Sequence, residues 1–235
     1  MKQTTLNLIA LFVFLATMAS LLGPMVQISP TVPALAVAAV LALAALDRFA
    51  LDGKLGSFLI DSLDRTSEAE RDRILHHEAG HFLVAQLLDI PVTDYTLSPW
   101  EAWKRGLPGQ GGVVFDAEAI EQEMNQGRLS AQLLSRYCTV WMAGIAAETL
   151  VFKTETGGSD DRQKIRAIYY QIQKPAQEAR IKERWSILQA RTLLEHNWEA
   201  YQSLVAAMAE RKPVEDCRQL IIARAEADNR QTKAI

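Results

Sequence analysis

Hydrophobic and polar residues divide the chain into two parts of different character. Residues 1–46 contain one charged side chain, Lys2, and two apolar runs at 6–23 and 34–46. The segment between these runs is also uncharged and holds three of the eight prolines. From Asp47 onward charged residues recur throughout the sequence, as they do on the surface of a folded domain in water. The pattern therefore predicts an apolar anchor followed by a separate domain.

The first apolar run is long enough to cross a membrane. It reads LNLIALFVFLATMASLLG, and its 18 residues would span about 27 Å as a helix. The second run, ALAVAAVLALAAL, is shorter and rich in alanine. We expect it to cross as well and to form a hairpin with the first, with an interfacial position or packing on the first run as the alternatives. For the first run a cleaved signal peptide is the alternative, because Lys2 precedes it and small residues surround Ala19.

Basic residues around the two runs predict their orientation. Lys2 precedes the first run, Arg48 and Lys54 follow the second, and the turn has no Lys or Arg. By the positive-inside rule, both ends of the hairpin face the cytoplasm. An Arg- and Ser-rich transit segment is not evident, which favours a bacterial plasma membrane or an internal membrane such as the thylakoid. We therefore expect an integral membrane protein in contact with lipid, with its main domain on the cytoplasmic side.

The remaining sequence predicts a mainly α fold with a small β-sheet. Residues 47–66 form a linker after the anchor at 1–46, and the main domain covers 67–235. A helix should begin near Ser67, where SEAE offers a capping box, and end near Leu88, before Pro91. The other expected elements are strands at 92–98 and 111–115, with a loop between them, and helices at about 129–152, 160–173 and through 177–225.

Composition narrows the classes of function. The net charge of −3 is small and both signs are mixed along the chain, which argues against nucleic acid as a partner. Cys138 lies in an apolar helical stretch and Cys217 among charged residues, and the chain has no other cysteine. This pair does not suggest a disulfide framework and fits a reducing compartment.

Three of the four histidines lie within the six residues HHEAGH, at 76–81. On a helix His77 and His81 project from one face and can share a metal ion. Glu78 is rotated by about 100° from His77, so its carboxylate can reach a metal-bound water without ligating the metal. This is the H-E-x-x-H arrangement of zinc peptidases. His76 points off the ligand face and should be solvated or lie behind the ligands. The apolar flanks disfavour a chance pair of unpartnered histidines.

Zinc requires a third protein ligand, and it must come from elsewhere in the chain. The downstream positions that hold Gly and His in metzincins are Val84 and Leu87 here. The candidates for the third ligand are Glu148, Asp160, Asp161 and His196. Glu148 is an acid on an inward helical face, whereas the two aspartates lie at a helix start, where carboxylates also suit the helix dipole. The residues alone leave Glu148 and Asp161 open.

Four motifs follow one another in a familiar order: HHEAGH, YTLSP, GIAAETLVF and TGGSDD. In this order they resemble the peptidase domain of FtsH-type zinc metalloproteases, over roughly residues 67–225. The resemblance implies one zinc ion (Zn2+) per chain, bound by His77, His81 and Asp161, with Glu78 as the general base. It makes Glu148 an acid that accepts the other ring N–H of a zinc-binding histidine.

The sequence departs from the FtsH pattern at several positions. Thr149 replaces the second Glu of the Ala-Glu-Glu pair, Asp160 replaces Asn, and Gly158 stands where the family has Ala. The family's ATPase module is also missing, since no G-x-x-x-x-G-K-[ST] motif occurs in the chain. The resemblance is therefore to a membrane-tethered peptidase domain that lacks the AAA ATPase.

These observations predict a membrane-anchored zinc metalloendopeptidase without an ATPase of its own. Its expected substrates are unfolded or damaged polypeptides, including those of membrane proteins. An extended substrate should add along the edge of the GGVVF strand at 111–115. The alternative is an accessory or regulatory subunit of a full-length FtsH-type ATP-dependent protease complex. The partners expected besides substrate are therefore a second copy of the chain or an FtsH-type protease. The intact Glu78 disfavours that alternative. A purely structural zinc site is disfavoured because such sites are closed by four protein ligands.

Overall fold

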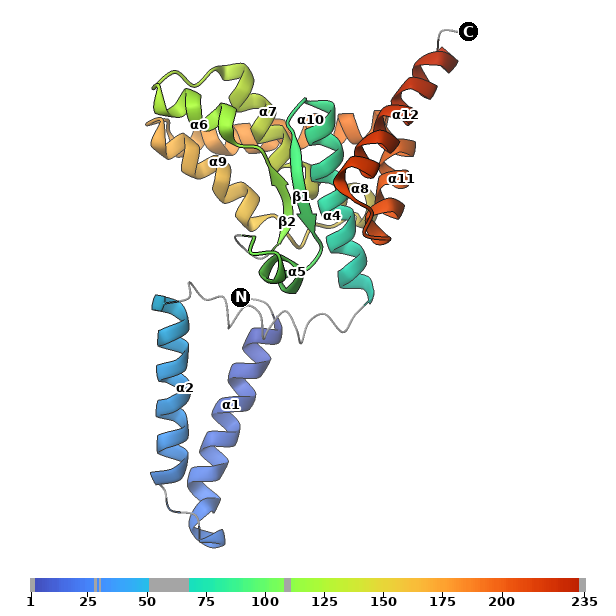
Figure 1. Cartoon of the computed structure of the whole chain (residues 1–235). Helices are drawn as coiled ribbons and strands as arrows, with labels where there is room; N and C mark the ends of the chain where they lie inside the picture. The colour runs from blue at the N-terminus through green and yellow to red at the C-terminus, as the bar shows by residue number, and fades with distance from the viewer. Residues whose placement is uncertain (1–2, 28, 30, 51–67, 108–110, 233–235) are drawn as a thin grey trace. The chain divides into compact units, whose positions relative to one another are not determined.

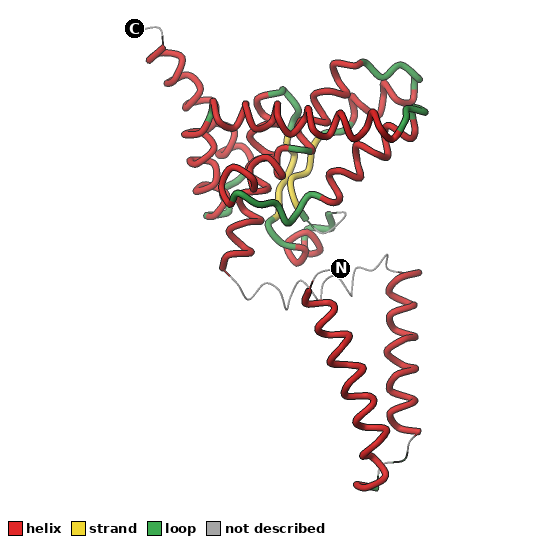
Figure 2. The backbone as a smooth tube through the Cα atoms, turned by 180° about the vertical axis from the view of Figure 1, so that it is seen from behind, coloured by secondary structure: helices red, strands yellow, loops and turns green. Residues whose placement is uncertain are grey.

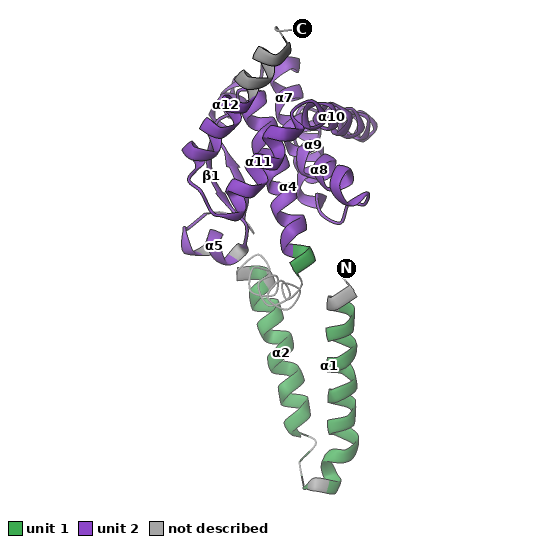
Figure 3. Ribbon diagram, turned by 90° about the vertical axis from the view of Figure 1, so that its right-hand side faces the viewer, with its two compact units in different colours: residues 1–70 green, residues 71–235 purple. Residues whose placement is uncertain are grey.

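The structure, a computed structural model, describes residues 3–27, 29, 31–50, 68–107 and 111–232 of the 235-residue chain (Figure 1). The chain divides into two compact units, residues 1–70 and 71–235 (Figure 3). The described residues are mainly helical with one two-stranded sheet, which confirms the predicted class. Most of the predicted linker, at 51–66, and the Ser67 cap lie outside the described residues.

The N-terminal unit contains two helices joined by a short turn. They are α1 (Gln3–Leu22), followed by the 3-10 helix η1 (Gly23–Val26), and α2 (Thr31–Ala50), and α1 and α2 contact each other. Among the described residues, Leu6–Met25 is long and apolar enough to cross a membrane by length and composition. The apolar part of α2, Thr31–Asp47, is shorter than that. The first predicted span is therefore supported at this level, and the second stays a prediction.

The second part of the chain holds the sheet and nine described helices. In chain order these elements are α4 (Glu68–Leu87), β1 (Val92–Thr96), α5 (Pro99–Lys104), β2 (Gly112–Phe115), α6 (Glu118–Asn125), α7 (Ala131–Trp141), α8 (Ala143–Phe152), α9 (Ser159–Gln171), α10 (Ala176–His196), α11 (Trp198–Ala209) and α12 (Val214–Thr232). The expected strands, the helix that carries HHEAGH and the helical C-terminal third are confirmed. Helix α5 lies in a segment that we expected to be a loop.

Helix α4 runs through the core of this unit, and Ala79–Ala85 are buried. Gly80 makes the packing possible, because a Cβ at this position would lie 2.7 Å from both the Ala143 carbonyl oxygen and the Ala147 Cβ. Atoms that close would overlap, so α4 and the start of α8 approach each other at a distance that only glycine allows. This contact brings the histidine face of α4 against α7 and α8.

The prediction of one helix over 129–152 is wrong. The chain instead forms α7 and α8, with a break at Met142, whose backbone N–H bonds to Cys138 O and Val140 O. The last carbonyls of a helix are open to partners outside it, so the Val140 carbonyl can accept a second donor besides the Met142 N–H. His81 Nδ1 supplies one over 2.7 Å. The break therefore coincides with a tertiary contact between α4 and the end of α7.

Strands β1 and β2 pair antiparallel, with Tyr95 opposite Val113 and Thr96 opposite Gly112. Helices of the same unit lie in front of the two strands in Figure 2, which is the view from behind, whereas the strands face the viewer in Figure 1. The Val113 N–H donates to Glu78 Oε2 of α4 over 2.9 Å, so β2 reaches the helix that carries the histidines.

Candidate metal centre

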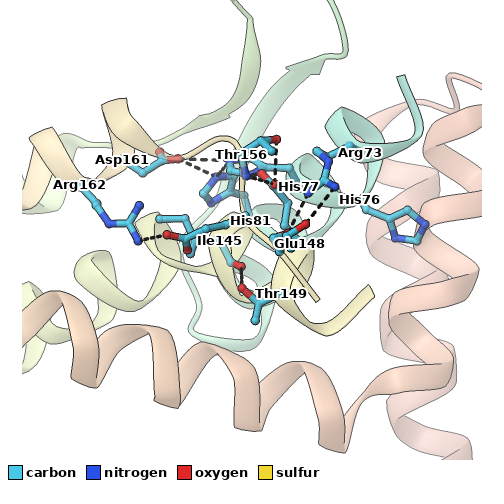
Figure 4. Close-up of polar contacts among 12 residues, drawn as sticks. Arg73, His76, His77, His81, Ile145, Glu148, Thr149, Thr156, Asp161 and Arg162 are labelled. Atoms are coloured by element: carbon cyan, nitrogen blue, oxygen red, sulfur yellow. Dashed lines mark hydrogen bonds and ion pairs between the residues drawn. The ribbon is translucent and has the colours of Figure 1, made fainter. Parts of the chain in front are cut away.

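Three side chains from two helices converge on one point (Figure 4). His77 and His81 come from α4, and Asp161 comes from the first turn of α9. His77 Nε2 lies 3.0 Å from His81 Nε2 and 3.2 Å from Asp161 Oδ2, and His81 Nε2 lies 3.4 Å from the same oxygen. All three residues are nearly buried, at 9%, 4% and 7% exposure respectively. This cluster could hold a metal ion.

The spacing of these atoms fits a tetrahedral zinc ion. Ligand atoms that lie about 2.0–2.2 Å from zinc at tetrahedral angles lie about 3.3–3.6 Å from one another. The three separations in the cluster, 3.0, 3.2 and 3.4 Å, are close to that spacing. Three protein ligands would leave the fourth position open, as in catalytic rather than structural zinc sites.

The other ring nitrogens decide which atoms face the centre. His77 Nδ1 donates to Glu148 Oε1 and His81 Nδ1 donates to Val140 O, each over 2.7 Å. When Nδ1 carries the proton, Nε2 of a neutral imidazole has a lone pair. Two lone pairs and a carboxylate oxygen therefore face one another, and such a set needs a cation between its members.

When no metal ion is bound, a proton on His77 can supply the positive charge between these ligand atoms. Burial by itself would lower the pKa of His77, but the hydrogen bonds with Asp161 and Glu148 outweigh burial and raise this pKa to about 10. Burial would raise the pKa of Asp161, yet the adjacent His81 and His77 hold it well below its usual range. The centre thus has negative character that either a proton on His77 or a metal ion can balance.

Glu148 lies directly behind His77 and is 1% exposed. Its Oε1 accepts from His77, and its Oε2 accepts from Arg73 Nη1 over 3.0 Å and from the Thr156 N–H over 2.9 Å. Burial would raise the pKa of this carboxyl, but the hydrogen bonds from His77, Thr156 and Arg73 lower it to about 2. Glu148 therefore stays a carboxylate that orients His77, and it is not part of the converging cluster.

The second oxygen of Asp161 has its own partner. Lys164, three residues further along α9, donates from Nζ to Asp161 Oδ1 over 2.9 Å. This contact leaves Oδ2 as the oxygen that faces the histidines. Asp160 is exposed and accepts from the Ser159 hydroxyl over 3.1 Å. The two neighbouring aspartates therefore have different surroundings.

The remaining histidines lie outside the cluster. His76 is half-buried, and its Nδ1 lies 2.8 Å from the Tyr201 hydroxyl of α11. That hydroxyl also donates to the His76 carbonyl oxygen over 3.0 Å. His196, an alternative third ligand in the sequence, is exposed at the end of α10 and donates to the Thr192 carbonyl oxygen. Of the four candidates for a third ligand, the structure brings Asp161 to the two histidines.

Two glycines leave room for the side chains of His77 and Glu148. A Cβ at Gly144 would overlap the imidazole of His77, and one at Gly157 would lie 2.7 Å from Glu148 Oε1. Both glycines belong to the motifs GIAAETLVF and TGGSDD. These motifs therefore shape the walls around His77 as well as supplying Glu148 and Asp161.

Sequence reasoning missed several groups that hold the cluster in place. Arg73 could have been noticed, because it lies four residues before His77 on the same helical face, and Lys164 could have been found by its spacing from Asp161. The backbone groups of Val140 and Val113 give no signal in the sequence, since their role depends on which elements pack together.

The chain matches no known family model and no curated protein. The geometry of the centre and the motifs themselves therefore carry the functional argument.

Proposed function

We propose that the chain is a membrane-anchored, zinc-dependent endopeptidase that cleaves unfolded polypeptides. The observation that carries this proposal is the convergence of His77, His81 and Asp161, with Glu78 beside them on α4. The motif order that resembles FtsH-type peptidases supports the same assignment. The apolar helix at Leu6–Met25 supports attachment to a membrane.

The residues have distinct roles in the proposed reaction. His77, His81 and Asp161 would hold the zinc ion. When bound, zinc would polarise the scissile carbonyl and lower the pKa of a water molecule to about 7. Glu78 would take the proton from the attacking water and deliver it to the leaving amine. The Val113 N–H holds one oxygen of the Glu78 carboxylate, so the base has a defined position before substrate arrives.

The protein substrate should be extended when it reaches this centre. The sequence contains no ATPase motif that would unfold a protein, so loops, tails and damaged segments, including those of membrane proteins, are the substrates that fit. Such a segment would pair along β2, whose Val113 lies next to the base.

The variant Glu78→Gln tests the catalytic role directly. Full-length protein purified in detergent should contain one zinc ion per chain, measured by elemental mass spectrometry, and should cleave denatured casein. Glu78→Gln should keep the zinc and the helical circular dichroism spectrum but lose at least about 100-fold in cleavage rate, because the general base is removed.

The matched control is Glu68→Gln, which changes an exposed glutamate at the start of the same helix. It should cleave casein at the wild-type rate. Equal activity of wild type and Glu78→Gln, or a wild-type protein that holds no zinc, would refute the proposed function.

A further inference from the structure

Arg73 connects three segments around the metal centre. Its Nη1 donates to Glu148 Oε2 over 3.0 Å and to the Thr154 carbonyl oxygen over 2.8 Å. Its Nη2 lies 3.4 Å from Thr154 Oγ1, and the guanidinium carbon lies 4.5 Å from the ring centroid of Phe152. One side chain of α4 therefore touches the acid of α8, the end of α8 and the loop that leads to α9.

Each of these segments carries part of the centre. Helix α4 supplies His77, α8 supplies the Glu148 carboxylate behind that imidazole, and the loop after Phe152 ends at the turn that presents Asp161. We propose that Arg73 is a positioning residue of the metal site. It holds Glu148 in line with His77 Nδ1, and it fixes the loop from which α9 places Asp161 opposite the histidines. The proposal rests on the metal centre of the proposed function.

Burial makes this contact stronger than an ordinary surface ion pair. Glu148 is 1% exposed, and the Arg73 side chain is 18% exposed. A buried carboxylate that loses a cationic partner is costly, whereas an exposed pair contributes little. The Thr156 N–H gives Glu148 one further donor, but it adds no positive charge.

The geometry also favours arginine over lysine at this position. A guanidinium is planar and carries several N–H donors in a fixed arrangement, so it can serve a carboxylate, a carbonyl and an aromatic ring together. A lysine ammonium could keep the charge near Glu148, but it could not hold the same set of partners. Replacement by lysine should therefore preserve part of the effect.

The test is metal affinity of the full-length protein, measured by competition with a chelating dye for Zn2+ and by the visible spectrum with Co2+. Removing partners that orient metal ligands lowers metal affinity by about 10–100-fold. Arg73→Met, which keeps an unbranched stem beside Phe152, should show a loss of this size and an altered cobalt spectrum. Arg73→Lys should fall between this variant and the wild type.

Arg71→Ala is the matched control, because Arg71 is exposed two positions earlier on the same helix. It should keep wild-type affinity for both metals. If Arg73→Met does not fold, Arg73→Lys alone decides, and wild-type affinity in that variant would overturn the proposal.

A double-mutant cycle separates positioning from general stabilisation. If Arg73 acts through Glu148, the change Arg73→Met should cost less than about twofold in zinc affinity when Glu148→Gln is already present. A purely structural role would lower thermal stability, leave the cobalt spectrum unchanged and give additive effects, and that result would overturn the proposal.

These outcomes are separate from those of the casein experiment. A wild type that binds zinc but cleaves nothing would refute the peptidase assignment and leave the role of Arg73 intact. Conversely, wild-type affinity in Arg73→Met with normal casein cleavage would refute the role of Arg73 alone.

Discussion

Each of the three candidate ligands points one side-chain atom at the centre and makes a hydrogen bond with a second atom to another part of the protein. Glu148 holds His77, the Val140 carbonyl holds His81, and Lys164 holds Asp161. Metal sites commonly depend on such outer partners, which fix the orientation of the ligand and its protonation. The HHEAGH motif predicted that His77 and His81 are metal ligands. The partners that orient these two side chains lie on other helices, so the motif alone could not identify them.

The raised pKa of His77 predicts a pH dependence of the metal-free protein. The pKa is 6.5 for an ordinary histidine and about 10 in the fold, so protonated His77 stabilises the fold fully below pH 6.5. This contribution, on the order of a few kcal/mol, should be lost as the pH rises toward 10. Urea unfolding in the presence of a chelator, from pH 6 to 10, measures it.

The reference for this measurement is His77→Asn, which removes the titrating group. The free energy of unfolding of the wild type should exceed that of the variant by most at pH 6 and by least at pH 10. At pH 8, zinc binding to the wild type should also release about one proton, because the metal takes the place of the His77 proton. A difference that stays constant with pH would contradict this prediction.

At the scale of elements, the two acidic residues in the first turn of α9 have different explanations, stabilisation by the helix dipole and metal binding. Asp160 and Asp161 both lie near the positive end of the helix dipole, which is worth about 0.3–1 kcal/mol to a carboxylate there. Of these two aspartates, Asp161 faces His77 and His81, whereas Asp160 is exposed. Asp161 is therefore the candidate ligand, and the neighbouring Asp160 serves as the control for its substitution.

Asp161→Asn should weaken zinc binding by more than about 100-fold, since it removes a ligand rather than an outer partner. Asp160→Asn should keep zinc affinity and lose at most about 1 kcal/mol of stability. Isothermal titration with zinc and thermal unfolding measure the two effects. Similar zinc affinities in the two variants would show that Asp161 is not a ligand.

The ends of a helix can be predicted from the sequence when residues next to them determine where the helix stops. The end of α4 before Pro91 and the start of α9 after Gly158 follow from local residues, and the sequence located both within a few positions. The break at Met142 was not predicted, and it coincides with a tertiary contact, because Gly80 and His81 of α4 pack against the junction of α7 and α8. Likewise, the choice of Asp161 over Glu148 needed the three-dimensional contact or the family resemblance.

At the scale of the whole molecule, the chain combines an exposed apolar helix with a core built around α4. In α1 the side chains of Leu11, Phe14 and Leu15 are more than half exposed, and the structure describes no core that covers them. Apolar side chains in such numbers are stable in lipid rather than in water. The two units therefore suit different solvents.

Removal of residues 1–50, which takes away both apolar runs, should release the protein from membranes. The full-length chain should stay in the membrane fraction after an alkaline carbonate wash if α1 crosses the membrane as predicted. The truncated chain should appear in the soluble fraction. Intact-mass measurement of the full-length product provides the control, since a mass that lacks the first run would identify it as a cleaved signal peptide.

For the proposed peptidase, the hydrogen bond between Val113 and Glu78 has a consequence for inhibitors. A peptide mimic that pairs with β2 would need the Val113 N–H, which already serves the Glu78 carboxylate. Such a compound would therefore compete with the protein's own side chain, and its affinity should rise when Glu78 is replaced by a residue that does not accept this hydrogen bond. Compounds that bind only through a metal-chelating group would be insensitive to that exchange.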